Sequence, residues 1–395
     1  MTDRFVVSLD DRALRTRLRQ TRWLDMPAGP AGAYGVDQAA LRALVEYWLD
    51  AFSWDRMQAA INRHDHYRTT IDGQCIHYIH VRSGNPRATP LILTHGWPWT
   101  FWDMRRLFAP LTDPSSHGGR ESDAFDLIVP SLPGFGFSTP AAPAGGNFWR
   151  TADLWHRLMT DVLGYDRYGA AGGDWGAFVS AQLGHKYAWQ IIAIHLSQAV
   201  PLGMFSTGHP WRARISGGPS PSEAALRYER RFASHLAVHM IEPDTLAYGL
   251  NDSPMGMLAW LFQRWCSWDG TSGEGVSALT KNQMLANATL YWLNESLPSS
   301  LRFYANAGLE PWRPSHGRHP LVEAPTGVTM LAGDLPEGVD LERVVARFRH
   351  SPRGAQYNIV HAAAHEKGGH FAHFQNPAAI VADIRATFRA VRGAD

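Results

Sequence analysis

A carboxylate occupies an unusual position in the stretch AAGGDWGAF, residues 170–178. Asp174 follows a short apolar run that predicts a strand, and the residues after it predict a helix. Gly172 and Gly176 stand two positions to either side, as a tight strand-to-helix turn requires, because larger side chains would collide there. Unpaired N–H groups at a helix start favour a neighbouring negative charge. The pattern therefore predicts either a nucleophilic carboxylate on an exposed turn or a simple helix N-cap.

Three further segments carry residues suited to hydrolysis. HGWP (95–98) follows the apolar run LILT, so the backbone N–H of Trp97 is placed to receive an oxyanion. Asp334 comes just past another apolar run, and His370 lies in the glycine-flanked segment EKGGHF. The chain order of nucleophile, acid and histidine is the order of hydrolytic triads in strand–helix folds. Together these segments predict a triad of Asp174, Asp334 and His370.

The elements that must position these residues follow the pattern of a parallel sheet. Short apolar runs alternate with helical stretches, as is typical of buried parallel strands; the runs are 90–96, 125–134, 168–173, 191–197, 327–333 and 356–364. Residues 202–314 contain helical and polar stretches without such a run, which predicts an inserted helical cap. We expect a helical N-terminal extension over 1–66 packed on the core, and an α/β core formed by 67–201 and 315–395.

Composition limits the function classes. The 395 residues carry 37 Lys and Arg against 36 Asp and Glu, for a net charge of +1, so neither nucleic acid nor an anionic membrane is an expected partner. No signal-peptide core or membrane anchor is evident, which predicts a cytoplasmic protein. The histidines of HAAAHEKGGHFAHF (361–374) do not have the helical two-histidine zinc spacing, so no metal is expected.

The chain resembles the microsomal-type epoxide hydrolase family, a branch of the α/β-hydrolases. The resemblance spans nearly the whole length and rests on motifs that occur together: TRW (21–23), TTIDG (69–73), HGWP (95–98), GGDWG (172–176), LNDSP (250–254), RFY (302–304) and GGHF (368–371). It implies an α/β-hydrolase fold, with a mostly parallel central sheet flanked by helices, a helical cap insertion and a helical N-terminal extension.

The resemblance also implies roles for individual residues. Asp174 would be the nucleophile, His370 the base and Asp334 its orienting acid, with Glu337, three residues further on, as an alternative acid. Tyr304, in the RFY motif of the cap, would donate a hydrogen bond to the epoxide oxygen.

The family commonly presents two cap tyrosines, but His235 occupies the slot expected for the first one. A histidine can donate a hydrogen bond in either protonation state. Because an imidazolium is the stronger acid, donation by His235 would make ring opening rise as the pH falls towards its pKa. Tyr228 and Tyr248 are the alternative donors.

An aspartate nucleophile suits epoxide chemistry. An epoxide has no carbonyl, and its strained ring is opened by attack at carbon, for which an ionised carboxylate is a good nucleophile. Water activated by His370 would then hydrolyse the enzyme ester to a vicinal diol, with the N–H groups of Trp97 and Trp175 as the oxyanion hole. The partners are a small epoxide and water, no cofactor is needed, and a homodimer is compatible with the sequence.

Aromatic residues near these motifs favour a bulky apolar or aryl substrate. Trp99, Trp102 and Phe137 are the candidate substrate-binding side chains, although a rigid core would explain them equally well. Two other functions remain open. A haloalkane dehalogenase uses the same fold and an aspartate nucleophile, and a ligand-binding homologue could keep the fold without turnover.

Overall fold

A single twisted sheet forms the centre of the protein. The structure, a computed structural model, describes residues 2–25, 27, 34–142, 145–206, 231–269, 279–336 and 338–392. In this part of the chain the sheet has nine strands in the order β1-β2-β3-β5-β4-β6-β7-β8-β9. Their bounds are β1 Asp3–Phe5, β2 His66–Ile71, β3 Gln74–Val81, β4 Thr89–Thr94, β5 Phe125–Pro130, β6 Tyr168–Gly172, β7 Ile191–Leu196, β8 Val322–Leu331 and β9 Tyr357–His365.

The six strands β5, β4, β6, β7, β8 and β9 pair parallel with one another. At one edge β1, β2 and β3 pair antiparallel, and β3 also pairs antiparallel with β5. The central parallel strands are apolar on both faces because helices cover both. Ile92, Ile128, Ala170 and Ile194 are fully buried. All six strands expected from the apolar runs are present, and the predicted α/β-hydrolase fold is confirmed.

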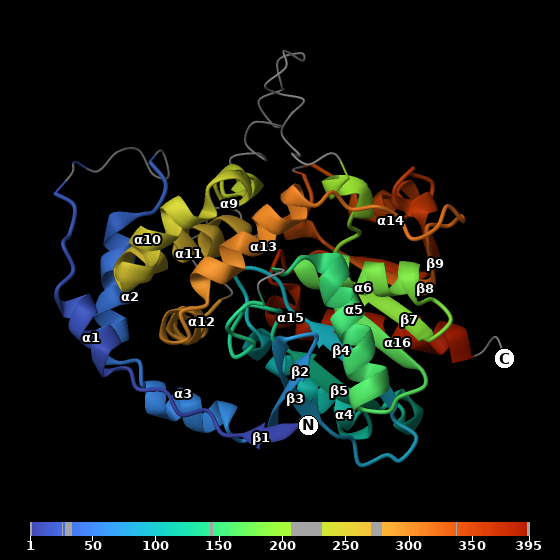
Figure 1. Ribbon diagram of the computed structural model, residues 1–395. Coiled ribbons are helices and arrows are strands. Elements are labelled where there is room, and N and C mark those ends of the chain that lie inside the picture. The colour runs from blue at the N-terminus through green and yellow to red at the C-terminus, as the bar shows by residue number, and fades with distance from the viewer. Residues whose placement is uncertain are drawn as a thin grey trace.

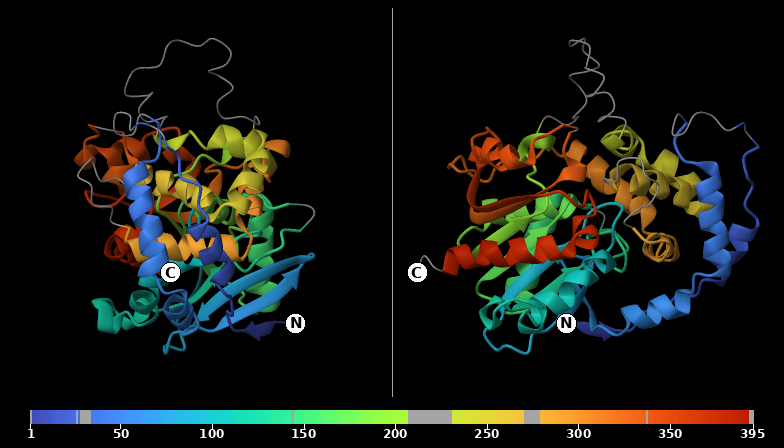
Figure 2. Two further views of the ribbon diagram at one scale, coloured as in Figure 1. Left: turned by 90° about the vertical axis from the view of Figure 1, so that its left-hand side faces the viewer. Right: turned by 180° about the vertical axis from the view of Figure 1, so that it is seen from behind.

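Helices cover the two faces of the sheet. α5 and α6 lie on one face and α16 crosses the other, as Figures 1 and 2 show from opposite sides. The helices of the core are α4 Phe108–Thr112, α5 Phe148–Arg157, α6 Trp175–Lys186, α14 Leu341–Arg349, α15 Ala372–Gln375 and α16 Pro377–Arg392. No helix within the described ranges has the length and apolar character that crossing a bilayer requires.

A group of helices lies between β7 and β8 in the chain and sits above the sheet (Figure 1). Its members are α9 Leu236–Ile241, α10 Pro243–Asp252, α11 Pro254–Trp268, α12 Lys281–Leu293 and α13 Leu297–Leu309. We call these five helices the cap. Of the residues described between 202 and 314, none forms a strand. Cap residues line a cavity together with the loops that follow parallel strands of the sheet. Ligands bind at this carboxyl end of the strands in open α/β sheets.

The N-terminal segment, for which a helical extension packed on the core was expected, contains a strand as well as three helices. It begins with strand β1, which pairs with β2, and continues as α1 Arg12–Arg19, α2 Gln38–Asp50 and α3 Trp54–Ile61. These helices curve round one side of the molecule and reach the cap (Figure 2). Trp48 Nε1 donates to Thr289 Oγ1 at 3.1 Å, and Tyr47 Oη donates to Asn282 Oδ1 at 3.0 Å. The apolar face of α2 thus buries itself against α11 and α12, so the extension joins the core to the cap.

Candidate active site

Asp174 occupies the turn between β6 and α6 in a strained conformation. Its φ is 52° and its ψ is −124°, a region that residues other than glycine rarely adopt. Gly176 permits the turn, because a Cβ there would lie 1.9 Å from the carbonyl oxygen of Thr94. The Asp174 side chain makes no capping hydrogen bond to α6. Asp174 therefore occupies the N-cap position of α6 without capping the helix through its side chain, and the carboxylate lines a cavity.

The two oxygens of Asp174 have different partners. Oδ1 accepts a hydrogen bond from the backbone N–H of Trp97 at 2.8 Å. Oδ2 lies 3.4 Å from Nε2 of His370. Trp175 begins α6, so its N–H belongs to the first turn, where backbone donors have no partner within the helix. The expected oxyanion donors therefore lie next to the carboxylate, and Gly96 keeps the Trp97 loop close because a Cβ there would collide with Asp174.

His370 is held between two indole rings on the loop after β9. It is 7% exposed, and its ring centroid lies 4.7 Å from that of Trp268 and 5.7 Å from that of Trp99. Its backbone N–H donates to the carbonyl of Trp268 at 3.1 Å. The position of the His370 imidazole is thus fixed by Trp268 of the cap together with Trp99 of the core.

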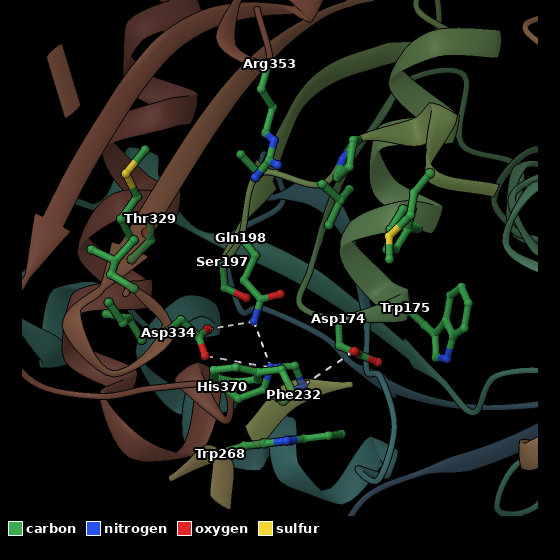
Figure 3. Close-up of a pocket in the computed structure, with 18 of the residues that line it drawn as sticks. Asp174, Trp175, Ser197, Gln198, Phe232, Trp268, Thr329, Asp334, Arg353 and His370 are labelled. Atoms are coloured by element: carbon green, nitrogen blue, oxygen red, sulfur yellow. Dashed lines mark hydrogen bonds and ion pairs between the residues drawn. The ribbon is translucent and has the colours of Figure 1, made fainter. Parts of the chain in front are cut away.

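Asp334 lies on the opposite side of His370 from Asp174, and Gln198 lies between the acid and the histidine (Figure 3). Asp334 Oδ1 is 3.8 Å from His370 Nδ1. Gln198 Nε2 is 2.7 Å from Asp334 Oδ2 and 3.0 Å from His370 Nδ1. Gln198 was missed from the sequence, although it follows the apolar run of β7 just as Asp174 and Asp334 follow theirs. The alternative acid, Glu337, lies outside the described residues.

Charge and burial oppose each other at the histidine. Burial alone would lower the pKa of His370, but its pairing with Asp174 and the negative charge of Asp334 outweigh burial and raise that pKa above 6.5. Burial raises the pKa of Asp334, and the neighbouring His370 opposes this rise. In the free site the neighbouring carboxyl groups thus make His370 hold its proton more tightly than an isolated histidine does.

Tyr304 of α13 and His235, which directly precedes α9, line the same cavity as Asp174. The Tyr304 ring centroid lies 4.7 Å from that of Trp175 and 5.4 Å from that of His235, and both side chains line the cavity with Asp174. Burial, followed by the charge of Asp174, raises the pKa of Tyr304 well above 10, so its hydroxyl stays protonated.

His235 is neutral near pH 7. Burial, followed by the charge of His239, lowers its pKa well below 6.5, and its ring stacks on Trp97 at a centroid separation of 5.2 Å. The expected rise of ring opening towards the ordinary histidine pKa is therefore not supported. Of the alternative donors, Tyr248 is 83% exposed and outside the cavity lining, and Tyr228 lies outside the described residues.

Three expected substrate-binding residues do not line the cavity. Trp99 packs behind His370, Trp102 donates from Nε1 to the sulfur of Met57 at 3.2 Å, and Phe137 packs edge-on against Phe5. Trp102 is buried within the 3-10 helix that starts at Phe101, and Trp99, which precedes that helix, is buried as well. All three are buried core residues, so the described cavity does not support the expectation that they contact substrate.

The cavity has a volume of about 1000 Å³. Its walls are largely apolar, as is usual for small-molecule sites; among the lining residues are Phe178, Val200, Met204, Phe205, Phe232, Leu236, Met330, Val344 and Phe348. A bulky apolar molecule therefore fits in front of Asp174.

The histidine-rich stretch near the C-terminus has a structural partner. His361 Nε2 and His365 Nε2 lie 2.9 Å and 2.8 Å from the carboxylate of the buried Asp383. Burial raises the pKa of Asp383, but hydrogen bonds led by that from His361 outweigh burial and lower the pKa to about 2. Among the described residues no group of three His, Cys, Asp or Glu side chains is arranged to hold a metal ion.

Comparison with known proteins decides the family. The model for the epoxide hydrolase N terminus matches residues 4–104, and the model for the alpha/beta hydrolase fold matches residues 89–216. Epoxide hydrolase 1 of Oryctolagus cuniculus is 30% identical over 374 residues, which cover 89% of this chain and 80% of that protein. The chain belongs to the epoxide hydrolase family. It is therefore a hydrolase that acts on ether bonds.

Other members of the epoxide hydrolase family match over similar lengths. A Stigmatella aurantiaca protein assigned provisionally as an epoxide hydrolase is 36% identical, over 96% of this chain and 82% of that one. The crystal structure of juvenile hormone epoxide hydrolase from Bombyx mori superposes with a TM-score of 0.80 at 26% identity, covering 100% of this chain and 94% of that one. The epoxide hydrolase of Aspergillus niger gives a TM-score of 0.76 at 26% identity, covering 99% and 97%. The resemblance predicted from the motifs is confirmed.

Proposed function

We propose that the protein converts a bulky apolar or aryl epoxide to a vicinal diol through a covalent ester on Asp174. The observation that carries the proposal is the arrangement of Asp174, which faces Tyr304 of the cap across one apolar cavity and contacts both Trp97 N–H and His370. A carboxylate nucleophile, a protonated donor and a base thus surround a single space.

In the first half of the reaction, an Asp174 oxygen attacks an epoxide carbon and the carbon–oxygen bond of the ring breaks. The electron pair of that bond goes to the former ring oxygen, which takes a proton from the Tyr304 hydroxyl. His235 can donate a second hydrogen bond as a neutral imidazole. Because the cavity is apolar, these donors act in a medium that strengthens their interaction with the developing charge.

In the second half, the carbonyl carbon of the Asp174 ester is attacked by water. His370 takes a proton from that water, and the oxyanion is held by the N–H groups of Trp97 and Trp175. The tetrahedral intermediate collapses, and the alkyl oxygen takes the proton held by His370 and leaves as the second hydroxyl of the diol. The carboxylic acid of Asp174 then loses its proton, which returns through solvent to the Tyr304 phenolate, so that the carboxylate and the tyrosine hydroxyl are both restored.

Product analysis tests the proposed reaction against its rivals. The purified protein is incubated separately with styrene oxide and with a bromoalkane. We expect phenylethanediol from the first and no bromide from the second. Bromide release with no diol would identify a dehalogenase, and binding of both compounds without turnover would identify a non-catalytic homologue.

Replacing Tyr304 by Phe should slow ring opening by about 10²–10³-fold, because one preorganised donor to the leaving oxygen is lost. Hydrolysis of the ester should change little, since Tyr304 acts on an oxygen that is already a hydroxyl by then. Stopped-flow detection of alkylation, with hydrolysis followed separately, measures the two steps. Tyr248→Phe, an exposed tyrosine on α10, is the matched control. An equal loss in both steps would show that Tyr304 has a general structural role instead.

Gln198 should position the acid–base pair, because its amide bonds to Asp334 and lies beside His370 Nδ1. Gln198→Leu removes a donor from a buried carboxylate and should slow ester hydrolysis by about 10–100-fold. Gln198→Glu puts a negative charge beside His370, so the pH midpoint of hydrolysis should move upward. Pre-steady-state rates measured across pH check both effects. A pH midpoint that does not move in Gln198→Glu would show that Gln198 only fills space.

A further inference from the structure

The cavity in front of Asp174 continues outward to α14 and the loop that follows it. Its outer lining includes Val344 and Phe348, with the guanidinium-bearing side chains of Arg347 and Arg353. Figure 3 shows the Arg353 side chain extending into the cavity towards Gln198. The space thus has an apolar interior and a basic outer end.

Arg347 and Arg353 have no acidic partner among the described residues, in contrast to arginines such as Arg150, Arg157 and Arg302, which each pair with a carboxylate. Arg347 and Arg353 are both exposed and make no ion pair with any residue that the structure describes. A guanidinium group that is free of a carboxylate partner and faces a ligand cavity can bind a carboxylate, sulfate or phosphate by two parallel hydrogen bonds.

The charges at the two ends of the cavity orient a ligand. The carboxyl groups in its lining, those of Asp174 and Asp334, lie at the inner end and disfavour a second anion there. Arg347 and Arg353 favour an anion at the outer end. A molecule with a neutral epoxide at one end and an anionic group at the other therefore enters with the epoxide towards Asp174.

The size of the cavity fits such an elongated molecule. Its volume of about 1000 Å³ lies at the upper end of the range for small-molecule pockets. Apolar side chains that also line the cavity, among them Val200, Met330 and Leu335, accommodate an alkyl or aryl body. A small epoxide would leave most of this surface uncovered.

We propose that Arg347 and Arg353 form a subsite for an anionic group, so that the preferred substrates are amphipathic epoxides with an acidic group remote from the ring. This inference rests on the proposed function and adds the substrate class to it. The subsite selects and orients substrate, while the chemistry at Asp174 is unchanged.

A pair of matched substrates tests the subsite. 10,11-Epoxyundecanoic acid and its methyl ester share the epoxide and the chain, and differ in charge. We expect the wild-type enzyme to prefer the acid in kcat/KM, and Arg347→Gln with Arg353→Gln to lower the acid-to-ester ratio by about fivefold to tenfold, as two partly exposed ion pairs would. Higher salt should reduce the wild-type preference by screening. Arg353→Glu should lower the acid-to-ester ratio more than Arg353→Gln does, because it places a negative charge where the anionic group of the substrate would bind.

Arg349→Gln is the matched control, because Arg349 is an exposed arginine on the same helix that does not line the cavity. Arg349→Gln removes one positive charge from α14 and should keep the wild-type acid-to-ester ratio. An acid-to-ester ratio that is equal in the wild type and the double variant would overturn the subsite. Styrene oxide separates this outcome from failure of the proposed function, since a wild-type protein that forms no diol from it is not acting as proposed at all.

Discussion

Replacing His370 by Gln should leave ring opening intact and stop the reaction at a covalent adduct. Asp174 attacks carbon without help from a base, so the ester still forms. Its hydrolysis needs a proton acceptor for water, and removing that acceptor should slow it by about 10²–10⁴-fold. Intact-mass spectrometry after mixing with styrene oxide should show the protein heavier by one substrate molecule. His350→Gln, an exposed histidine that ends α14, is the control and should accumulate no adduct.

The pKa of His370 should differ between the free enzyme and the enzyme alkylated on Asp174. In the free enzyme Asp174 helps to raise the pKa of His370, so the neutral base form is gained only as the pH rises through that raised value. Alkylation turns Asp174 into a neutral ester and removes this contribution, while burial continues to lower the pKa. His370 should therefore lose its proton more readily in the intermediate, when a base is required.

Two measurements compare these states. NMR titration gives the pKa of His370 in the free protein, and single-turnover hydrolysis at different pH values gives it in the ester. We expect the second midpoint to be lower than the first. A higher midpoint in the ester would contradict the charge argument, and an unmodified His370→Gln protein that still binds styrene oxide would contradict the assignment of the base.

Much of the site could be predicted from the sequence because strand ends are local features. Asp174, Asp334 and His370 each follow a strand whose sequence is largely apolar, and parallel strands place their carboxyl ends at one edge of the sheet. Tyr304 came from the resemblance, since nothing in the pattern of α13 distinguishes a catalytic tyrosine from a core tyrosine.

The parts that could not be predicted depend on side-chain direction and on contacts between distant segments. Gln198 follows a strand end as Asp174 does, but its role depends on an amide reaching between two other side chains. Trp99 and Trp102 lie beside the HGWP motif, yet both are buried in the core, Trp102 within the 3-10 helix that follows the motif. The contact of α2 with the cap joins residues more than 200 positions apart, such as Trp48 and Thr289, and no local pattern reports it.

Asp174→Ala should abolish turnover, with a loss of roughly 10⁴-fold or more, since the nucleophile itself is removed. Loss of activity alone does not distinguish attack by Asp174 from a role in activating water. The origin of the two oxygen atoms of the diol distinguishes these two mechanisms. In the proposed route one diol oxygen comes from the epoxide and the other from the Asp174 carboxylate, while solvent oxygen enters the carboxylate when the ester is hydrolysed.

A single turnover in ¹⁸O-labelled water, with enzyme in excess, should therefore give diol that carries no label and a protein that carries one ¹⁸O. Peptide mass spectrometry should place that atom on the peptide containing Asp174. Later turnovers should transfer the label to diol, because each attack uses an oxygen of the same carboxylate. Label in the diol of the first turnover would mean that water attacked the epoxide directly. Asp174 would then be a base that activates water, and the strained turn that carries it would serve a different mechanism on the same fold.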